Sequence, residues 1–196
     1  MGRLIIGVDE AGRGPLAGPV VAGAVTLMGM GIAGLDDSKK LSAKRRSALE
    51  SEIKAQCRWA VGVVSPEEID QLNIFGATMR AMALAVGALV EVMGEVPHEV
   101  LVDGNLTPMG RVREWRWSAR AIVGGDALEP CISAASIIAK QHRDRLMCDL
   151  AEIHPEYGWE RNAGYGTREH MEALRRYGPT PHHRRSFAPV AQLELI

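Results

Sequence analysis

Four acidic residues share one kind of position in the sequence, because each follows a short apolar segment of strand length. They are Asp9, Glu10, Asp103 and Asp126. In an open α/β sheet, residues just outside the carboxyl ends of adjacent strands converge on one crevice. Clustered carboxylates repel and raise one another's pKa, and a divalent cation removes that penalty. Since neither His nor Cys belongs to the set, we predict a hard ion, Mg²⁺ or Mn²⁺, and not zinc.

Two such ions, about 4 Å apart, would activate a water and stabilise the leaving oxygen in the hydrolysis of a phosphodiester.

Each acid alone also allows a simpler interpretation. Adjacent acids at a strand end suit a solvated turn, Asp103-Gly104 is a common turn pair, and Asp126 could cap a helix. Neighbouring strand residues point to opposite faces, so Asp9 and Glu10 can share a ligand only if the strand ends or bulges there.

A glycine-rich loop follows the first two acids directly. Gly12, Arg13 and Gly14 leave three peptide groups with little side-chain cover. Such backbone is open to close approach by a polar ligand, so we predict an anion site beside the metal site. A dinucleotide-binding loop is the alternative. It fits poorly, because the spacing to a third glycine is wrong and the following segment has the character of a strand.

The segments that must position these residues alternate between strand and helix signals. We predict strands at residues 4–8, 20–27, 58–64, 100–102 and 119–123. We predict a helical stretch that opens at residues 37–42 and runs to about residue 55, a short helix that starts at residue 66, and long helices at 75–93 and about 130–153. A last helix follows Thr167 and ends at about residue 177. The predicted N-caps are Ser42, Ser65 and Thr167. A meander of three strands, followed by two strands joined through helices, predicts an α/β fold: a five-stranded mixed sheet with helices on both faces.

The composition is that of a globular protein with one domain and a small appendage. Its 196 residues are 46% apolar and 24% charged. No uninterrupted apolar run approaches the length of a membrane span, so we expect no membrane partner. The N-terminus enters a strand without a signal peptide, which predicts a cytoplasmic protein. Three cysteines without CxxC spacing indicate reduced thiols and neither a zinc site nor disulfides.

Charge is distributed unevenly, although the net charge of −1 argues against a general nucleic-acid binder. Residues 39–58 carry seven basic side chains, residues 65–103 carry seven acidic ones, and residues 168–185 carry five arginines. The two basic segments could line a track for a phosphate backbone. Solvated helix faces are the commoner explanation of such charge runs.

Residues 7–21, GVDEAGRGPLAGPVV, resemble the signature of type 2 ribonuclease H (ribonuclease HII). Further motifs follow in the family's order over nearly the whole chain. They are DSKKLS at 37–42, IDQLNI at 69–74, VDGN at 102–105, GD at 125–126, ISAASIIAK at 132–140, GYGT at 164–167 and HRRSFAP at 183–189. The resemblance implies a ribonuclease H-like fold and an endonuclease that cuts the RNA strand of RNA–DNA hybrids. It also implies incision at single ribonucleotides embedded in duplex DNA, leaving 5′-phosphate and 3′-hydroxyl ends.

The resemblance also implies roles for particular residues. The catalytic metal ligands match Asp9, Glu10, Asp103 and Asp126. The loop that contacts the 2′-hydroxyl of the ribonucleotide matches Gly12, Arg13 and Gly14. The tyrosine that senses the RNA–DNA junction matches Tyr165. Residues expected to contact phosphates are Lys39, Lys40, Arg184, Arg185 and Ser186.

Two sites depart from the family's pattern. Asn162-Ala163 stands where family members usually carry His-Lys, and Gly124 stands where they tend to carry Lys. Both changes remove positive charge near the expected path of the nucleic acid, which leaves substrate affinity and its salt dependence open. We expect His182 and His183 to be solvated or hydrogen-bonded and not to bind metal.

We expect residues 1–155 to form the catalytic domain and residues 156–196 a small C-terminal helical extension that completes the substrate-binding groove. We expect a monomer, and the sequence does not show whether a replication clamp recruits it. Two rival functions are weighed against the nuclease. A catalytically silent binding module would be favoured by loss of an acid, and none is lost. A metal-dependent hydrolase of a small phosphate ester gives no role to the two basic segments.

Overall fold

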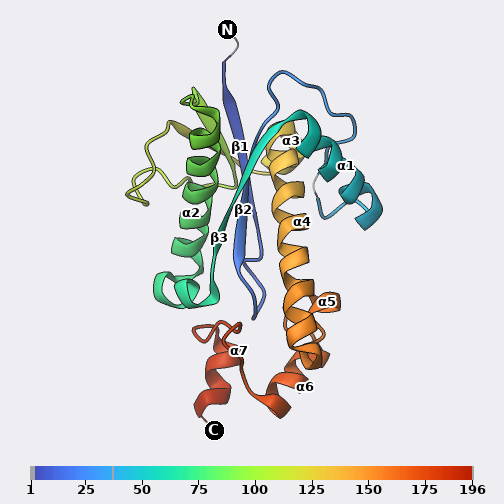
Figure 1. The fold of residues 1–196 in the computed structure, drawn as a ribbon. Coiled ribbons are helices and arrows are strands. Elements are labelled where there is room, and N and C mark those ends of the chain that lie inside the picture. The colour runs from blue at the N-terminus through green and yellow to red at the C-terminus, as the bar shows by residue number, and fades with distance from the viewer. Residues whose placement is uncertain (1–2, 37, 196) are drawn as a thin grey trace.

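A five-stranded sheet forms the centre of the protein, with the strand order β3-β2-β1-β4-β5 (Figure 1). The computed structural model describes residues 3–36 and 38–195. The strands are β1 (Ile5–Ala11), β2 (Val20–Thr26), β3 (Arg58–Val64), β4 (Glu99–Asp103) and β5 (Ala119–Ile122). Pairing is antiparallel within β1, β2 and β3, whereas β1, β4 and β5 run parallel. This topology confirms the predicted mixed sheet.

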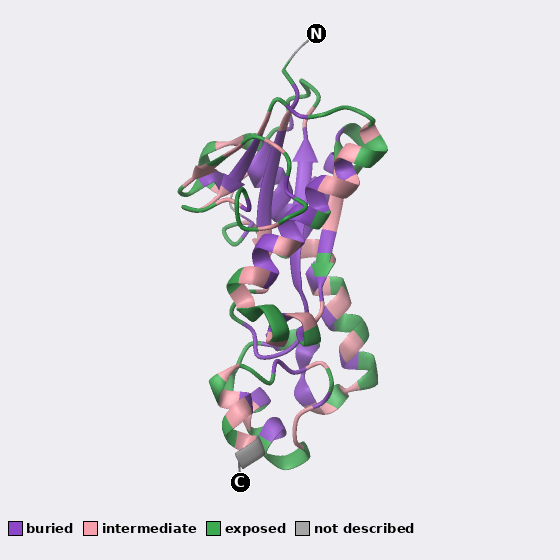
Figure 2. Cartoon of the chain, turned by 90° about the vertical axis from the view of Figure 1, so that its left-hand side faces the viewer, coloured by how far each residue is buried: buried purple, intermediate pink, exposed green. Residues whose placement is uncertain are grey.

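Helices cover both faces of the sheet, as predicted. One face carries α2 (Pro66–Met93), and the other carries α4 (Pro130–Ile153) with α1 (Ala43–Gln56) packed against it. The shorter elements are α3 (Gly125–Leu128), η1 (Pro155–Tyr157), α5 (Trp159–Asn162), α6 (Arg168–Tyr177), α7 (Ala188–Ala191) and η2 (Gln192–Leu195). Figure 2 shows the buried residues, in purple, concentrated in the strands and in the helical surfaces that face them.

Three predicted N-caps are confirmed, because each side chain accepts a hydrogen bond from a backbone N–H three residues further on. They are Ser42, Ser65 and Thr167. Helix α2 bends at Asn73, where φ is 57° and the side-chain oxygen accepts from the N–H groups of Phe75 and Gly76. The two helices predicted in this region are therefore the two arms of α2. Asp37, which opens the first predicted helical stretch, lies outside the described residues.

Among the described helices, α2 is long and apolar enough to cross a membrane by length and composition alone. Half of its most apolar 18-residue window is buried inside the protein. Met82, Val86 and Leu89 of this helix belong to the main hydrophobic core against the sheet. Such burial is typical of a core helix in a globular protein.

The predicted end of the first strand at Val8 is wrong. Strand β1 continues to Ala11, with Asp9 opposite Gly23 and Glu10 paired at the next position of β2. The apolar run marks only the buried part of the strand, whereas the backbone ladder continues for as long as β2 offers partners. The two acids therefore lie inside a regular strand and not in a turn.

Helix α4 lies directly on the backbone of β1 and β2, because glycines occupy the contact positions. A Cβ atom added at Gly7 would lie 2.2 Å from the carbonyl carbon of Cys131. One added at Gly23 would lie 2.4 Å from the carbonyl oxygen of Ala135. Only glycine permits this approach. The contact fixes the height of α4 above the sheet and, with it, the first turns of α4 beside the acids.

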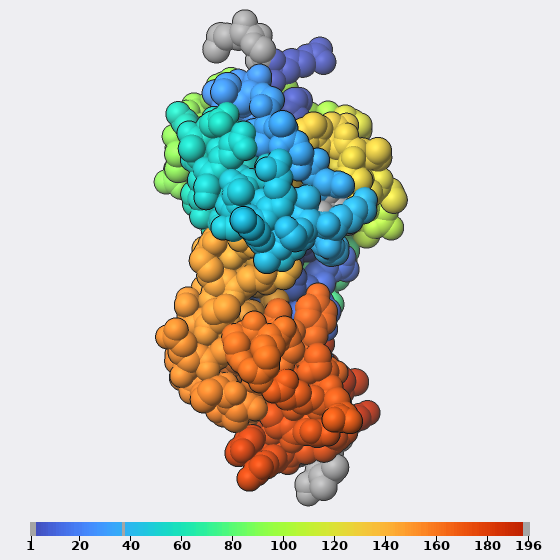
Figure 3. All heavy atoms as spheres, turned by 90° about the vertical axis from the view of Figure 1, so that its right-hand side faces the viewer, coloured from blue at the N-terminus to red at the C-terminus, as the bar shows by residue number. Residues whose placement is uncertain are grey.

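The C-terminal residues gather at the end of the molecule opposite the N-terminus (Figure 1, Figure 3). Their buried side chains include Tyr157, Trp159 and Leu174, which pack with Leu16 from the loop after β1 and with Met147 from α4. The described part of this segment, residues 156–195, therefore packs around the end of α4 and onto the loop that carries the glycines. A domain boundary at residue 155 stays a prediction.

We predict that Gly23→Ala lowers the free energy of unfolding by about 2–3 kcal/mol, because the new methyl group meets helix backbone that cannot turn aside. The matched control is Gly31→Ala, whose methyl group meets nothing within 4 Å and should change stability by less than about 0.5 kcal/mol. Urea unfolding followed by circular dichroism measures both. Equal stability of the two variants would mean that α4 is not seated on the sheet backbone.

Candidate metal centre and substrate pocket

Three of the four predicted acids come together at one edge of the sheet. Asp9 lies near the end of β1, Asp103 is the last residue of β4, and Asp126 lies in α3 just after β5. One carboxylate oxygen from each lies within 4.8 Å of the others. The parallel pairing of β1 with β4 brings their carboxyl ends to the same edge, which is why residues far apart in the sequence meet.

Hydrogen bonds from the backbone and from α4 orient this group. The Asp9 carboxylate accepts from the N–H of Glu10 at 2.7 Å, and the Asp103 carboxylate accepts from the N–H of Asp126 at 3.3 Å. The hydroxyl of Ser133, in the first turn of α4, donates to the carbonyl of Asp126 at 2.6 Å. The acids are thus held in place by main chain and helix, as a preorganised ligand set requires.

Burial and like charges oppose the ionisation of Asp9. The residue is 5% exposed, and desolvation, together with the charges of Glu10 and Asp103, raises its pKa to about 8. Desolvation also raises the pKa of Glu10, against the opposing effect of Arg13. A divalent cation would remove this cost, and carboxylate oxygens are the ligands that hard ions prefer. The residues present therefore fit Mg²⁺ or Mn²⁺.

Glu10 lies beside the group of three and not within it. Because β1 stays regular, the side chains of Asp9 and Glu10 leave the strand in opposite directions. The Glu10 carboxylate accepts a hydrogen bond from Arg13 Nη1 at 3.3 Å. Its charge nevertheless contributes to the raised pKa of Asp9, so the two acids remain electrostatic neighbours. A role for Glu10 as a metal ligand stays a prediction.

A pocket of about 290 Å³ is lined by Glu10 and by most of the predicted substrate contacts. Its walls include Glu10, Gly12, Arg13, Gly14, Lys39 and Tyr165. The Tyr165 ring lies beside the glycine loop, since a Cβ atom added at Gly14 would lie 3.4 Å from its Cε1. Sequence reasoning gave no role to Lys140 and Arg143, which also line the pocket. The signal for them in the sequence is that Lys140 ends the ISAASIIAK motif and Arg143 follows it by three residues.

The predicted phosphate contact of Arg184 does not fit the structure, because this residue is completely buried. Its guanidinium group donates to the carbonyl oxygens of Gly12 at 2.5 Å and of Arg13 and Gly18 at 3.0 Å. A further bond of 3.2 Å reaches Pro19. Burial lowers the pKa of Arg184 to about 9. Arg184 therefore fixes the backbone conformation of the glycine loop from its buried side.

A second buried arginine holds the same loop from α4. Arg143 donates to the carbonyl oxygens of Pro19 at 2.9 Å and of Ala17 at 3.1 Å. Its third bond, of 3.0 Å, reaches the carbonyl of Ala163, next to the turn that carries Tyr165. Burial lowers the pKa of Arg143 to about 10. Arg143 thus connects the glycine loop, α4 and the tyrosine turn.

The remaining predicted phosphate contacts lie outside the walls of the pocket. Lys40 is exposed and forms an ion pair of 3.6 Å with Asp36. The backbone N–H groups of Arg185 and Ser186 both donate to the Asp70 carboxylate at 2.9 Å. The Ser186 hydroxyl donates to the same carboxylate at 2.5 Å. The contacts of these residues with nucleic acid stay predictions.

Asn162 and Gly124, one residue from each departure from the family's pattern, have structural roles. Asn162 is buried, its side-chain amide donates to the carbonyl of Tyr157 at 2.7 Å, and its side-chain oxygen accepts from the N–H of Gly164 at 2.8 Å. It therefore braces the turn that carries Tyr165. Gly124 is the N-cap residue of α3 and has φ of 68°, a conformation that favours glycine over a residue with a Cβ atom.

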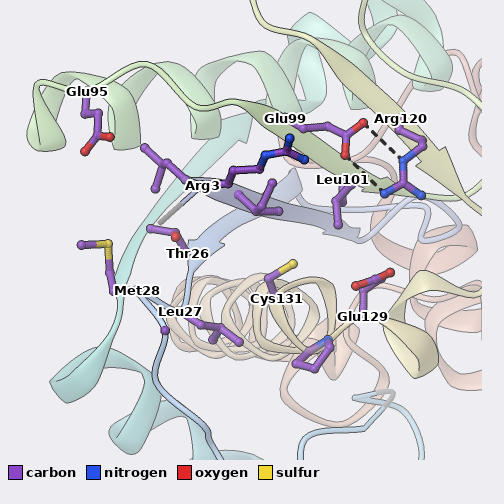
Figure 4. Close-up of a pocket in the computed structure, with 14 residues that line it drawn as sticks. Arg3, Thr26, Leu27, Met28, Glu95, Glu99, Leu101, Arg120, Glu129 and Cys131 are labelled. Carbon is purple, nitrogen blue, oxygen red and sulfur yellow. Dashed lines mark hydrogen bonds and ion pairs between the residues drawn. The ribbon is translucent and has the colours of Figure 1, made fainter. Parts of the chain in front are cut away.

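A larger pocket of about 650 Å³ lies at the beginning of β1 and β4, whereas the acids lie near the ends of these strands. Figure 4 shows the apolar side chains of Leu27 and Leu101 beside Cys131, with the Glu99–Arg120 ion pair at the rim. None of the predicted site residues lines it. The chemistry is therefore assigned to the smaller pocket, which is lined by Glu10, the neighbour of Asp9 in β1, and by the glycine loop.

A ribonuclease H-like fold that places carboxylates for a hard divalent ion beside a partly basic pocket defines a metal-dependent nuclease. The Ribonuclease HII family model matches residues 6–190, and the chain belongs to this family. It is therefore a ribonuclease H, an endonuclease that hydrolyses phosphodiester bonds with the help of divalent metal.

Individual relatives agree with this assignment. The chain is 74% identical over 193 residues to the Ribonuclease HII of Novosphingobium aromaticivorans, an alignment that covers 97% of this chain and 98% of the relative. The crystal structure of ribonuclease H2 from Pyrococcus horikoshii OT3 matches with a TM-score of 0.78 at 28% identity, over 98% of this chain and 97% of that chain. The PCNA:RNase HII complex from Archaeoglobus fulgidus matches with a TM-score of 0.73 at 28% identity, over 94% and 95%.

We predict that the metal-free protein loses stability as the pH rises from about 4 towards 8, because the folded-state pKa of Asp9 lies above its ordinary value of 3.8. Over this range the folded state holds a proton that the unfolded state releases, so each rise in pH favours unfolding. Asp9→Asn removes the group and should flatten the profile by a few kcal/mol.

Thermal unfolding in EDTA, measured at several pH values, gives the profiles of wild type and variant. The matched control is Glu152→Gln, which changes an exposed carboxylate at the far end of α4. Parallel profiles for wild type and Asp9→Asn would show that Asp9 ionises normally.

Proposed function

We propose that this ribonuclease HII incises duplex DNA at single embedded ribonucleotides, in addition to cutting the RNA strand of RNA–DNA hybrids. The products are 5′-phosphate and 3′-hydroxyl ends. One observation carries the proposal: Glu10, the glycine loop and the Tyr165 ring line a single pocket, and Asp9, which precedes Glu10 in β1, belongs to the group of three acids. The pocket therefore has one element for the chemistry, one for the ribose and one for the neighbouring nucleotide.

Asp9, Asp103 and Asp126 are the residues that would hold the metal, with Glu10 at the edge of the group. When bound, a pair of hard divalent ions would activate the attacking water and stabilise the leaving oxygen of the phosphodiester. The chain's own contribution is to hold the carboxylates in place and to restrict the water around Asp9, which is 5% exposed. Lys39 and Arg13, on the pocket wall, supply positive charge for the phosphates next to the cut.

The glycine loop suits recognition of a 2′-hydroxyl, which can both donate and accept a hydrogen bond. Arg184 and Arg143 fix the carbonyl groups of this loop, so its peptide groups have defined directions. Backbone groups lose no rotamer entropy when they bind. Among the described residues, the backbone at Gly14 has only the Tyr165 ring beside it, which leaves room for a ribose to approach, whereas the corresponding space at Gly12 holds the Arg143 side chain.

The Tyr165 ring is half exposed and lies next to Gly14. In this place it would pack on the sugar that follows the ribonucleotide, where an additional 2′-hydroxyl would collide with the ring. The loop would then require RNA on one side of the cut, and the ring would favour DNA on the other.

The complex of the Archaeoglobus fulgidus relative with PCNA supports a replication clamp as a partner of this chain.

We predict that Asp103→Asn and Asp126→Asn each lower the cleavage rate at least about 100-fold, because each variant loses a metal ligand. The fold should remain intact, since loss of one charge relieves repulsion in the metal-free site. The assay follows a labelled duplex with one ribonucleotide, with saturating Mg²⁺ and with EDTA. Asp149→Asn, in an exposed position on α4, is the control and should retain wild-type activity. Rates within about tenfold of wild type for both acid variants would overturn the assignment.

Tyr165→Ala should slow incision at a single ribonucleotide at least about tenfold more than it slows cleavage of an all-RNA strand paired to DNA, because only the first substrate has a deoxyribose for the ring. The matched control is Tyr177→Ala, which removes a tyrosine of similar exposure from the end of α6. Initial rates on both substrates give the ratio. An equal loss on both would assign Tyr165 to general binding or to the fold.

A further inference from the structure

A chain of hydrogen bonds between buried groups connects the C-terminal segment with the backbone of Tyr165. The N–H of Thr180 donates to His183 Nδ1 at 2.9 Å, and His183 Nε2 lies 3.1 Å from His170 Nε2. Trp159 Nε1 donates to His170 Nε2 at 3.2 Å. His170 Nδ1 lies 2.9 Å from the carbonyl oxygen of Tyr165. Both histidines are at most 1% exposed.

The fixed donors determine the direction of every bond in this chain. A backbone N–H and an indole N–H can only donate, so His183 Nδ1 and His170 Nε2 are both acceptors. The proton of neutral His183 therefore lies on Nε2 and points to His170. The proton of neutral His170 lies on Nδ1 and points to the carbonyl of Tyr165.

The surroundings keep both rings neutral. Burial lowers the pKa of His170. Burial, and the neighbouring rings of His170, His182 and His154, lower the pKa of His183 to about 3. A proton on His170 Nε2 would leave the donors of Trp159 and His183 without an acceptor. The directed chain gives each of these buried donors an acceptor, with the single lone pair of His170 Nε2 shared between Trp159 and His183.

The chain ends at the backbone of the residue whose ring adjoins the glycine loop. The Tyr165 N–H donates to the carbonyl of Asn162 at 2.9 Å, and the Tyr165 carbonyl also accepts from Thr167 N–H at 2.8 Å. His170 adds the bond that ties this turn to the buried core of the C-terminal segment. Arg184, directly after His183, holds the glycine loop itself. One short segment thus restrains both parts of the pocket.

We propose that His170 is a positioning residue for ribonucleotide recognition: its Nδ1–H bond to the Tyr165 carbonyl fixes the ring against Gly14 and so sets the preference for embedded ribonucleotides. The proposal rests on the proposed function of Tyr165. It predicts that His170 acts on the choice between substrates and leaves the chemistry at the acids unchanged. A merely structural His170 would instead affect both substrates through the amount of folded protein.

Two variants of His170 separate these possibilities, because asparagine and glutamine each retain one end of the imidazole. His170→Asn places an amide N–H near the position of Nδ1 and keeps the donor to Tyr165, while it loses the acceptor for Trp159 and His183. His170→Gln keeps the acceptor and loses the donor. Both leave buried polar groups unpaired, so both should lower the melting temperature to a similar extent.

The readout is the ratio of single-turnover rates on a duplex with one ribonucleotide and on an RNA–DNA hybrid, below the melting temperature of each variant. We expect His170→Gln to lower this ratio at least about tenfold and His170→Asn to change it by less than about threefold, since displacement of the ring by a fraction of an ångström suffices. Similar ratios for the two variants, or a larger loss in His170→Asn, would overturn the proposal.

Tyr165→Ala in the same assay separates failure of this proposal from failure of the proposed function. If Tyr165→Ala lowers the ratio and His170→Gln does not, only the role of His170 is lost. If Tyr165→Ala leaves the ratio unchanged, the role of Tyr165 is lost and the positioning role falls with it. In the double variant Tyr165→Ala, His170→Gln, we expect the ratio of Tyr165→Ala alone. A further loss in the double variant would contradict action through the ring.

Discussion

Repulsion between carboxylates at one edge of the sheet is the constraint on which the rest of the structure depends. Asp9, Asp103 and Asp126 present oxygens within 4.8 Å of one another, and a flexible scaffold would relax by moving them apart. Glycines in β1 and β2 let α4 lie on the sheet backbone, so the elements that carry the acids have little freedom to separate. The packing of sheet and helix therefore maintains a repulsion that a divalent ion relieves on binding.

The substrate pocket depends on buried charge in a different way. Arg143 and Arg184 direct their guanidinium groups at carbonyls of the loop at residues 12–19. Burying a charge is costly unless its hydrogen bonds are satisfied, so the loop and the arginines stabilise one another's positions. Arg184 comes from the C-terminal segment and the loop from the start of the chain, and His183 beside it continues to Tyr165 through His170. The pocket is therefore complete only when both ends of the chain are folded.

Local patterns are sufficient to predict the mixed five-stranded sheet, the main helices, three of their N-caps and the convergence of Asp9, Asp103 and Asp126, because strand ends and caps depend on neighbouring residues. They are insufficient where a contact joins distant segments. Arg184 and Arg185 look alike in the sequence, yet one is buried against the loop and the other is exposed. Apolar content likewise underestimates β1, whose length is set by β2. The role of Tyr165 comes from the family resemblance, since no spacing of residues indicates it.

Binding of Mn²⁺ to the protein alone tests most directly whether these acids form a cation site. Electron paramagnetic resonance measures the concentration of free Mn²⁺ while wild-type protein or the Asp103→Asn variant is added in the absence of nucleic acid. We expect the wild type to remove Mn²⁺ from solution in a saturable manner and Asp103→Asn to bind it at least about tenfold more weakly, because one of three clustered carboxylates is gone. Equal affinity of the two proteins, both folded by circular dichroism, would contradict the metal centre.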